Sequence, residues 1–133
     1  MALVDKMVFS DAQVATSSAA FASTNVLDTE VAASNIGGGT PLWLICRVNT
    51  TFTSLGTSFI ASLENATASG GTFVTIAISA TYTLGQLVKG FDLLTIPLPV
   101  DNLRYLRMMY TPTGTGASAG NIDALLTLNA PRN

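Results

Sequence analysis

The chain has 133 residues and a net charge of −2, with 11% charged and 48% hydrophobic residues. This length predicts one domain over residues 1–133, large enough to bury a core without a metal or a disulfide. Lys and Arg are too few and too scattered to neutralise phosphates, so we expect no nucleic-acid partner. No apolar run approaches the ~20 residues of a membrane span, so we expect no membrane partner. The high apolar content argues against disorder.

The N-terminal part of the chain is rich in small residues, and we expect residues 1–23 to form an extended arm. Residues 8–9 can begin a short strand within it, and a second short strand is predicted at residues 24–27. A loop is expected over residues 28–40. It contains the triplet Gly37–Gly39, but no Lys-Ser/Thr pair or helical pattern follows, so we interpret the triplet as a turn and not as a phosphate-binding loop.

Alternation of apolar and polar residues with a period of two indicates strands in the rest of the chain. Such alternation predicts strands at residues 42–48, 58–65, 72–80, 91–98, 104–111 and 121–130. Segments rich in Gly, Ser, Thr and Asn separate them, and we expect turns or loops at residues 49–57, 66–71 and 112–120. The leucine and valine spacing within residues 82–90 predicts a single helical turn that ends at Gly90.

About eight strands with no long helix between them exclude the alternating strand–helix order of parallel sheets. An all-β domain of two packed antiparallel sheets remains. We expect a jelly roll of about eight strands, with an immunoglobulin-like sandwich as the alternative.

The segment Ile96–Thr111 carries the most specific pattern. Two prolines, Pro97 and Pro99, end the preceding strand because they cannot donate ladder hydrogen bonds. In the following strand one face is aliphatic, and the other face presents Tyr105, Arg107, Met109 and Thr111. A face that mixes Tyr, Met and Arg is typical of a surface that meets a partner, although an ordinary half-exposed strand has the same alternation.

The inventory of chemically active side chains is small. The chain has no histidine and a single cysteine, Cys46, which lies in an apolar strand and is expected to be buried and unreactive. The eight carboxylates are scattered along the sequence. We therefore expect no enzymatic activity, no catalytic residues, no cofactor and no metal site. A carbohydrate- or host-surface-binding module, with Trp43, Tyr82 or Tyr105 as stacking platforms, stays open as an alternative function.

Four segments of the sequence occur in an order and spacing that resemble one protein family: LVDKMVFSDAQ (Leu3–Gln13), GGGTPLWL (Gly37–Leu44), LxxLVxG (Leu84–Gly90) and RYLRMMY (Arg104–Tyr110). This family comprises the jelly-roll cement, or decoration, proteins of tailed bacteriophages, of the type first seen on a Bordetella phage. The sequence departs from the family pattern at residues 64–72, where the loop is shorter and less charged.

The resemblance implies a structural protein of the virion, assembled in the host cytoplasm. It implies binding to the outer surface of the icosahedral capsid, where the protein would bridge subunits of the major capsid protein and form a homo-oligomer, a dimer or trimer at a symmetry axis. The residues that we expect to contact the capsid or another copy are Trp43, Tyr105, Arg107, Met109, Phe9 and Lys6.

Overall fold

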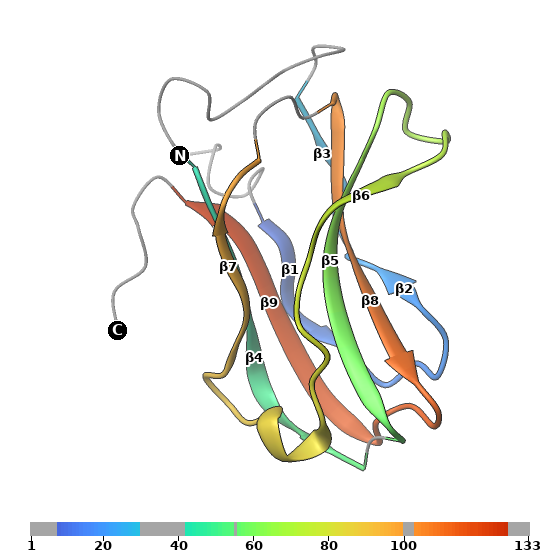
Figure 1. The fold of residues 1–133 in the computed structure, drawn as a ribbon, viewed down its shortest axis with the longest axis vertical. Helices are drawn as coiled ribbons and strands as arrows, with labels where there is room; N and C mark the ends of the chain where they lie inside the picture. The colour runs from blue at the N-terminus through green and yellow to red at the C-terminus, as the bar shows by residue number, and fades with distance from the viewer. Residues whose placement is uncertain (1–7, 30–41, 55, 100–102, 128–133) are drawn as a thin grey trace.

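The computed structural model describes residues 8–29, 42–54, 56–99 and 103–127. In these ranges the chain forms two antiparallel β-sheets that pack face to face (Figure 1). The first sheet has the strand order β1-β9-β4-β7. Its strands are β1 (Val8–Val14), β9 (Ala119–Thr127), β4 (Trp43–Thr53) and β7 (Asp92–Pro97).

The second sheet has the order β2-β8-β5-β6, and β3 also pairs with β8. Its strands are β2 (Phe21–Ala22), β3 (Leu27–Asp28), β8 (Tyr105–Thr113), β5 (Ser58–Ala66) and β6 (Val74–Ile78). When β2 and β3 are counted as one interrupted strand, the two sheets have the orders 1-8-3-6 and 2-7-4-5. This is the jelly roll that the sequence predicts. An immunoglobulin-like sandwich would place the first two strands in one sheet, whereas β1 and β2 lie in different sheets.

The core lies between the two sheets and follows the alternation in the sequence. In β4, Leu44, Cys46 and Val48 are fully buried while the residues between them are half-exposed, and β8 has the same pattern. The alternation predicted for these two strands and the predicted burial of Cys46 are therefore confirmed. The largest fully buried side chains are Tyr110, Phe9, Phe59, Leu44, Leu63, Leu87, Leu93, Leu106, Met108, Ile122 and Val48.

A buried polar contact crosses this apolar layer. The hydroxyl groups of Ser10 on β1 and Tyr110 on β8 lie 2.8 Å apart, and the Ser10 hydroxyl also donates to the side chain of Gln13 at 2.6 Å. Ser10 and Tyr110 are both buried. Because a buried hydroxyl without a partner is costly, this bond fixes how the two sheets face each other.

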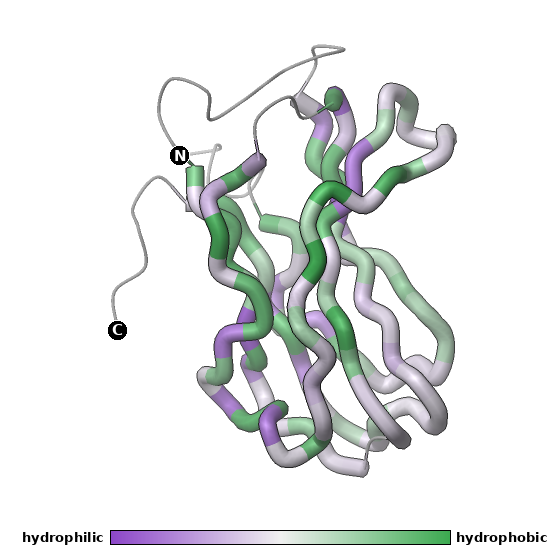
Figure 2. Tube along the Cα trace, in the orientation of Figure 1, coloured by the Kyte–Doolittle hydropathy of each residue, from purple (hydrophilic) through white to green (hydrophobic). Residues whose placement is uncertain are grey.

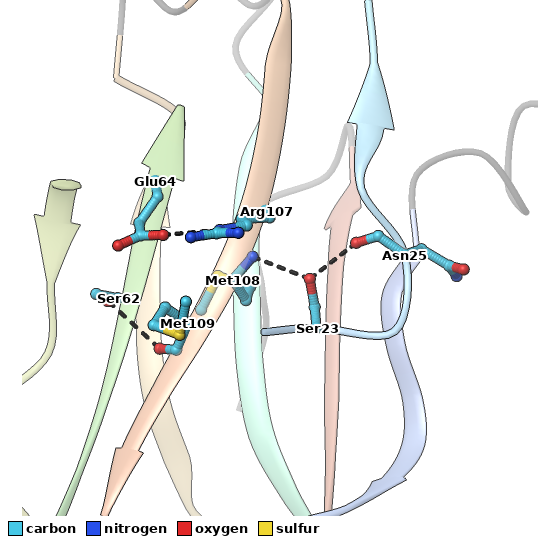
Figure 3. Close-up of polar contacts among 7 residues, drawn as sticks. All are labelled: Ser23, Asn25, Ser62, Glu64, Arg107, Met108 and Met109. Atoms are coloured by element: carbon cyan, nitrogen blue, oxygen red, sulfur yellow. Dashed lines mark hydrogen bonds and ion pairs between the residues drawn. The ribbon is translucent and has the colours of Figure 1, made fainter. Parts of the chain in front are cut away.

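Two parts of the expected N-terminal arm, residues 8–14 and 21–22, are instead strands of the sandwich. Residues 8–14 form β1, which pairs with β9 at the edge of the first sheet. The reason is the burial of Phe9, whose side chain is completely enclosed in the core. The short strand expected at residues 24–27 is replaced by β2 and β3, because between them the Ser23 hydroxyl accepts a hydrogen bond from the Met108 N–H (Figure 3).

Four strands, β4, β6, β8 and β9, have bounds that differ from the sequence prediction. β4 continues through an expected turn to Thr53, and the β8 and β9 strands shorten the expected loop at residues 112–120. Burial of Phe52 extends β4. Pro112 is tolerated in β8 because its neighbour Phe59 exchanges its backbone hydrogen bonds with Tyr82 and needs none from Pro112. β6, in contrast, is shorter than expected.

The predicted helical turn is present as the 3₁₀ helix η1 (Leu84–Gln86). The Gln86 side chain accepts a hydrogen bond from the Thr83 N–H at 3.0 Å, which closes the first turn. Leu87 follows and is fully buried, so the turn covers one end of the sandwich.

Replacing Gly120 by Ala should destabilise the fold. Gly120 has φ +145°, and a Cβ atom there would lie 2.5 Å from a ring carbon of Phe52. We expect Gly120→Ala to lower the free energy of unfolding by about 1–3 kcal/mol, measured by urea denaturation. Gly85 in η1 has open space around it, so Gly85→Ala is the matched control and should change stability by less than about 0.5 kcal/mol. Equal losses in the two variants would contradict the proposed clash.

The thiol of Cys46 should react only when the protein unfolds. Cys46 is completely buried, and this burial raises the pKa of the thiol well above its ordinary value. We expect modification by a disulfide reagent at pH 8 to be at least about 100-fold slower in the native protein than in urea. Comparable rates in the two conditions would show that the core opens readily near β4.

Candidate interaction surface

The outer face of the second sheet carries the central part of the predicted contact surface. Tyr105, Arg107 and Met109 alternate along β8 with buried residues, and all three are partly exposed. The sequence therefore places these three side chains correctly on one face. Their neighbours on that face come from β5, which pairs with β8 along its whole length.

Arg107 is held by two neighbours within the fold. Its Nε donates to Glu64 Oε1 at 2.8 Å (Figure 3). Its guanidinium lies 3.9 Å from the centre of the Phe73 ring. Glu64 is its direct cross-strand partner on β5, and Phe73 precedes β6. The side chains of Arg107 and Glu64 are 25% and 13% exposed. Arg107 thus ties β8, β5 and the start of β6 together and presents little free charge.

Met109 lies in an uncharged row that crosses the sheet. Its cross-strand partners are Ala22 on β2 and Ser62 on β5, and Ser62 is in turn opposite Ile78 on β6. The Ser62 hydroxyl donates to the Met109 carbonyl oxygen at 3.3 Å. Ser62 is small and buried, and the larger Met109 and Ile78 side chains lie on either side of it in this row.

Tyr105 lies beside a second ion pair. Arg104 donates to both carboxylate oxygens of Asp28 on β3, at 2.7 and 3.0 Å, and its guanidinium lies 5.0 Å from the centre of the Tyr105 ring. This end of the face is therefore polar, with its charges matched inside the fold.

The other predicted contact residues are not part of this surface. Trp43 is half-buried on β4, opposite Pro97 and Thr127, and therefore lies in the first sheet. The prediction that Phe9 contacts the capsid or another copy is wrong, because its side chain is enclosed in the core and has no exposed surface. Lys6 lies outside the described residues.

The sequence analysis missed the exposed apolar side chains of β6 and η1. Val74 and Ile78 on β6 are about 60% exposed, and Leu84 and Val88 around η1 are also exposed. Figure 2 shows the tube along β6 as green or pale. A signal for this surface is present in the sequence, because no charged residue occurs between Glu64 and Lys89.

The described residues contain no cluster of three or more His, Cys, Asp or Glu side chains that could hold a metal ion. Among the same residues, no helix has the length and apolar character needed to cross a membrane.

A protein-family model, described as Bbp16, matches residues 9–126. The chain belongs to the Bbp16 family. This is a family of Bordetella phage proteins, which agrees with the relation that the sequence resemblance indicated. The match omits one residue from the start of β1 and one from the end of β9, so the sandwich as a whole is the unit that the family shares. No curated protein matches the chain.

The Arg107–Glu64 pair should contribute more to stability than an exposed ion pair. Arg107→Met leaves the largely buried Glu64 carboxylate without its cation, and we expect a loss of about 1–3 kcal/mol in urea denaturation. The double variant Glu64→Gln/Arg107→Met should recover part of this loss.

The matched control is Arg47→Met, which breaks the more exposed pair of Arg47 with Asp92. Its expected cost is below about 1 kcal/mol. Equal costs for the Arg107 and Arg47 variants would show that the Glu64 pair has no special structural role.

Proposed function

We propose that this member of the Bbp16 family is a structural protein of the phage virion. In this proposal it is a cement protein that binds the outer surface of the icosahedral capsid and stabilises contacts between subunits of the major capsid protein. The observation that carries the proposal is the match to a phage protein family over the complete sandwich. The working form is proposed to be a homo-oligomer.

The surface supports a role in adhesion. Each arginine in the described ranges is paired with a carboxylate of the same chain, by Arg47–Asp92, Arg104–Asp28 and Arg107–Glu64. Binding by such a surface depends on shape and apolar contact more than on charge. Exposed aliphatic side chains on β6 provide apolar area of this kind.

The mechanism is selective binding to one state of the shell. A footprint that spans several subunits fits only when those subunits have the spacing of the assembled, expanded capsid. Binding to that state and to no other stabilises it by mass action. Simultaneous contacts to several subunits raise the overall affinity well above that of each contact.

The test uses purified protein and purified expanded shells. We expect the protein to co-sediment with the shells and to raise their melting temperature, and to leave isolated capsid subunits unbound. Because the arginines are already paired, occupancy should change by less than about threefold between low and high salt. Absence of the protein from virions, together with no binding to shells, would contradict the cement function.

A further inference from the structure

β6 is the open edge of the second sheet. In the described part of the chain it pairs with β5 alone. The Ser79 N–H bonds to the Ala61 carbonyl oxygen on β5, so alternation along the strand directs the N–H and C=O of Ile78 away from β5. The Ile78 side chain is 62% exposed, and that of Val74 is 59% exposed. Backbone hydrogen-bonding groups and aliphatic side chains are thus accessible together.

The other sheet edges in the described residues carry features that hinder strand addition. β7 includes Asp92 and ends at Pro97, whereas β1 contains Asp11 and has two register shifts in its pairing with β9. β2 and β3 have two residues each, and β3 includes Asp28. Charges, prolines, irregular pairing and short length are the usual means of preventing contact between edges.

β6 lacks charge and proline. It has one register shift, opposite Leu63 and Glu64, and Ile76 packs against the core there. Its five residues are all aliphatic or threonine, and the uncharged sequence continues on both sides from Asn65 to Val88. An edge strand of this composition is prone to pair with another strand. We therefore expect it to be covered in the working state of the protein.

The two ends of β6 are held in place. At its start, the Phe73 ring packs under the guanidinium of Arg107, which is fixed by Glu64. Beyond its end, Tyr82 exchanges two backbone hydrogen bonds with Phe59 and donates its hydroxyl to the Leu93 carbonyl oxygen at 2.8 Å. A strand held in this way loses little conformational entropy when it binds a partner.

We propose that β6 accepts an extended, uncharged segment of the capsid shell protein as an additional strand. This inference rests on the proposed function and names the chemistry of the partner. Main-chain hydrogen bonds between the added strand and the open edge would supply affinity. Aliphatic side chains at every second position of the added strand would pack on Ile78 and extend the row that runs through Ser62 and Met109.

The occupant is uncharged because the site offers no counter-charge. The ionic groups beside β6, Arg107 and Glu64, neutralise each other. A charged side chain buried over Val74 or Ile78 would lose its hydration without gaining a partner, which is unfavourable.

The experiment compares lysine substitutions at matched exposure. Ile78→Lys and Val74→Lys add a charge to the edge, and Val14→Lys adds one at an equally exposed position of β1, in the first sheet. We expect both β6 variants to weaken binding to expanded shells at least about tenfold and Val14→Lys to change it less than about twofold. Circular dichroism and melting temperature establish that each variant is folded.

Hydrogen exchange of the wild-type protein gives a second readout that requires no substitution. Since the Ile78 amide is directed away from β5, exchange in the peptide that contains it should slow when the protein binds shells. Unchanged exchange, or equal binding to shells by the β6 and β1 variants, would overturn the inference about β6. Shell binding by the wild-type protein would in that case still support the cement function.

Two further outcomes separate the alternatives. If wild-type protein does not bind shells, the proposed function fails. If Ile78→Lys instead dissociates an oligomer of the free protein in sedimentation velocity, a second copy of the chain occupies β6, and the assignment to a capsid segment is wrong.

Discussion

The pairing of each described arginine with a carboxylate on a neighbouring strand or segment limits the free positive charge on the described surface. Arg107 and Glu64 are adjacent on β8 and β5, and Arg104 joins the start of β8 to Asp28 on β3. These contacts use the cations to hold the sheet and leave little charge for a partner. A surface of this kind favours partners that are bound through shape, apolar contact and main-chain hydrogen bonds, which are less sensitive to salt than ionic contacts.

The jelly roll also depends on a polar contact inside an apolar core. The Ser10–Tyr110 bond joins β1 to β8 and therefore one sheet to the other. Burial raises the pKa of the Tyr110 hydroxyl well above its ordinary value, so the group stays neutral in its apolar surroundings. Apolar packing alone allows two sheets to slide relative to each other, whereas a directional bond selects one arrangement.

The strands could be predicted from the sequence where one face is buried, because burial imposes a period of two. This held for β4 and β8, whose apolar residues are buried at alternate positions as the sequence pattern predicts. Strand ends were predicted less well, since pairing partners distant in the sequence decide them. Phe52 extends β4 because it packs beside Gly120 on β9, and a local pattern contains no information about that contact.

The candidate surface, too, could be predicted from the sequence only in part. Alternation identified the outward row of Tyr105, Arg107 and Met109, but the role of Arg107 depends on Glu64 and Phe73, which tertiary structure alone brings close. Phe9 was assigned to a surface because its segment was expected to be an arm. The open edge at β6 follows from the strand order, which a list of strands does not determine.

The position of β9 has a consequence for how the molecule is made. β9 is the last strand along the described chain, yet it lies between β1 and β4 and completes the first sheet. A ribosome-bound chain that ends before residue 119 can form the β5–β6 hairpin, but it cannot join β1 to β4. Acquisition of the native fold must therefore wait until residues 119–127 have been synthesised, and such long-range closure makes folding slow compared with that of helical proteins of similar size.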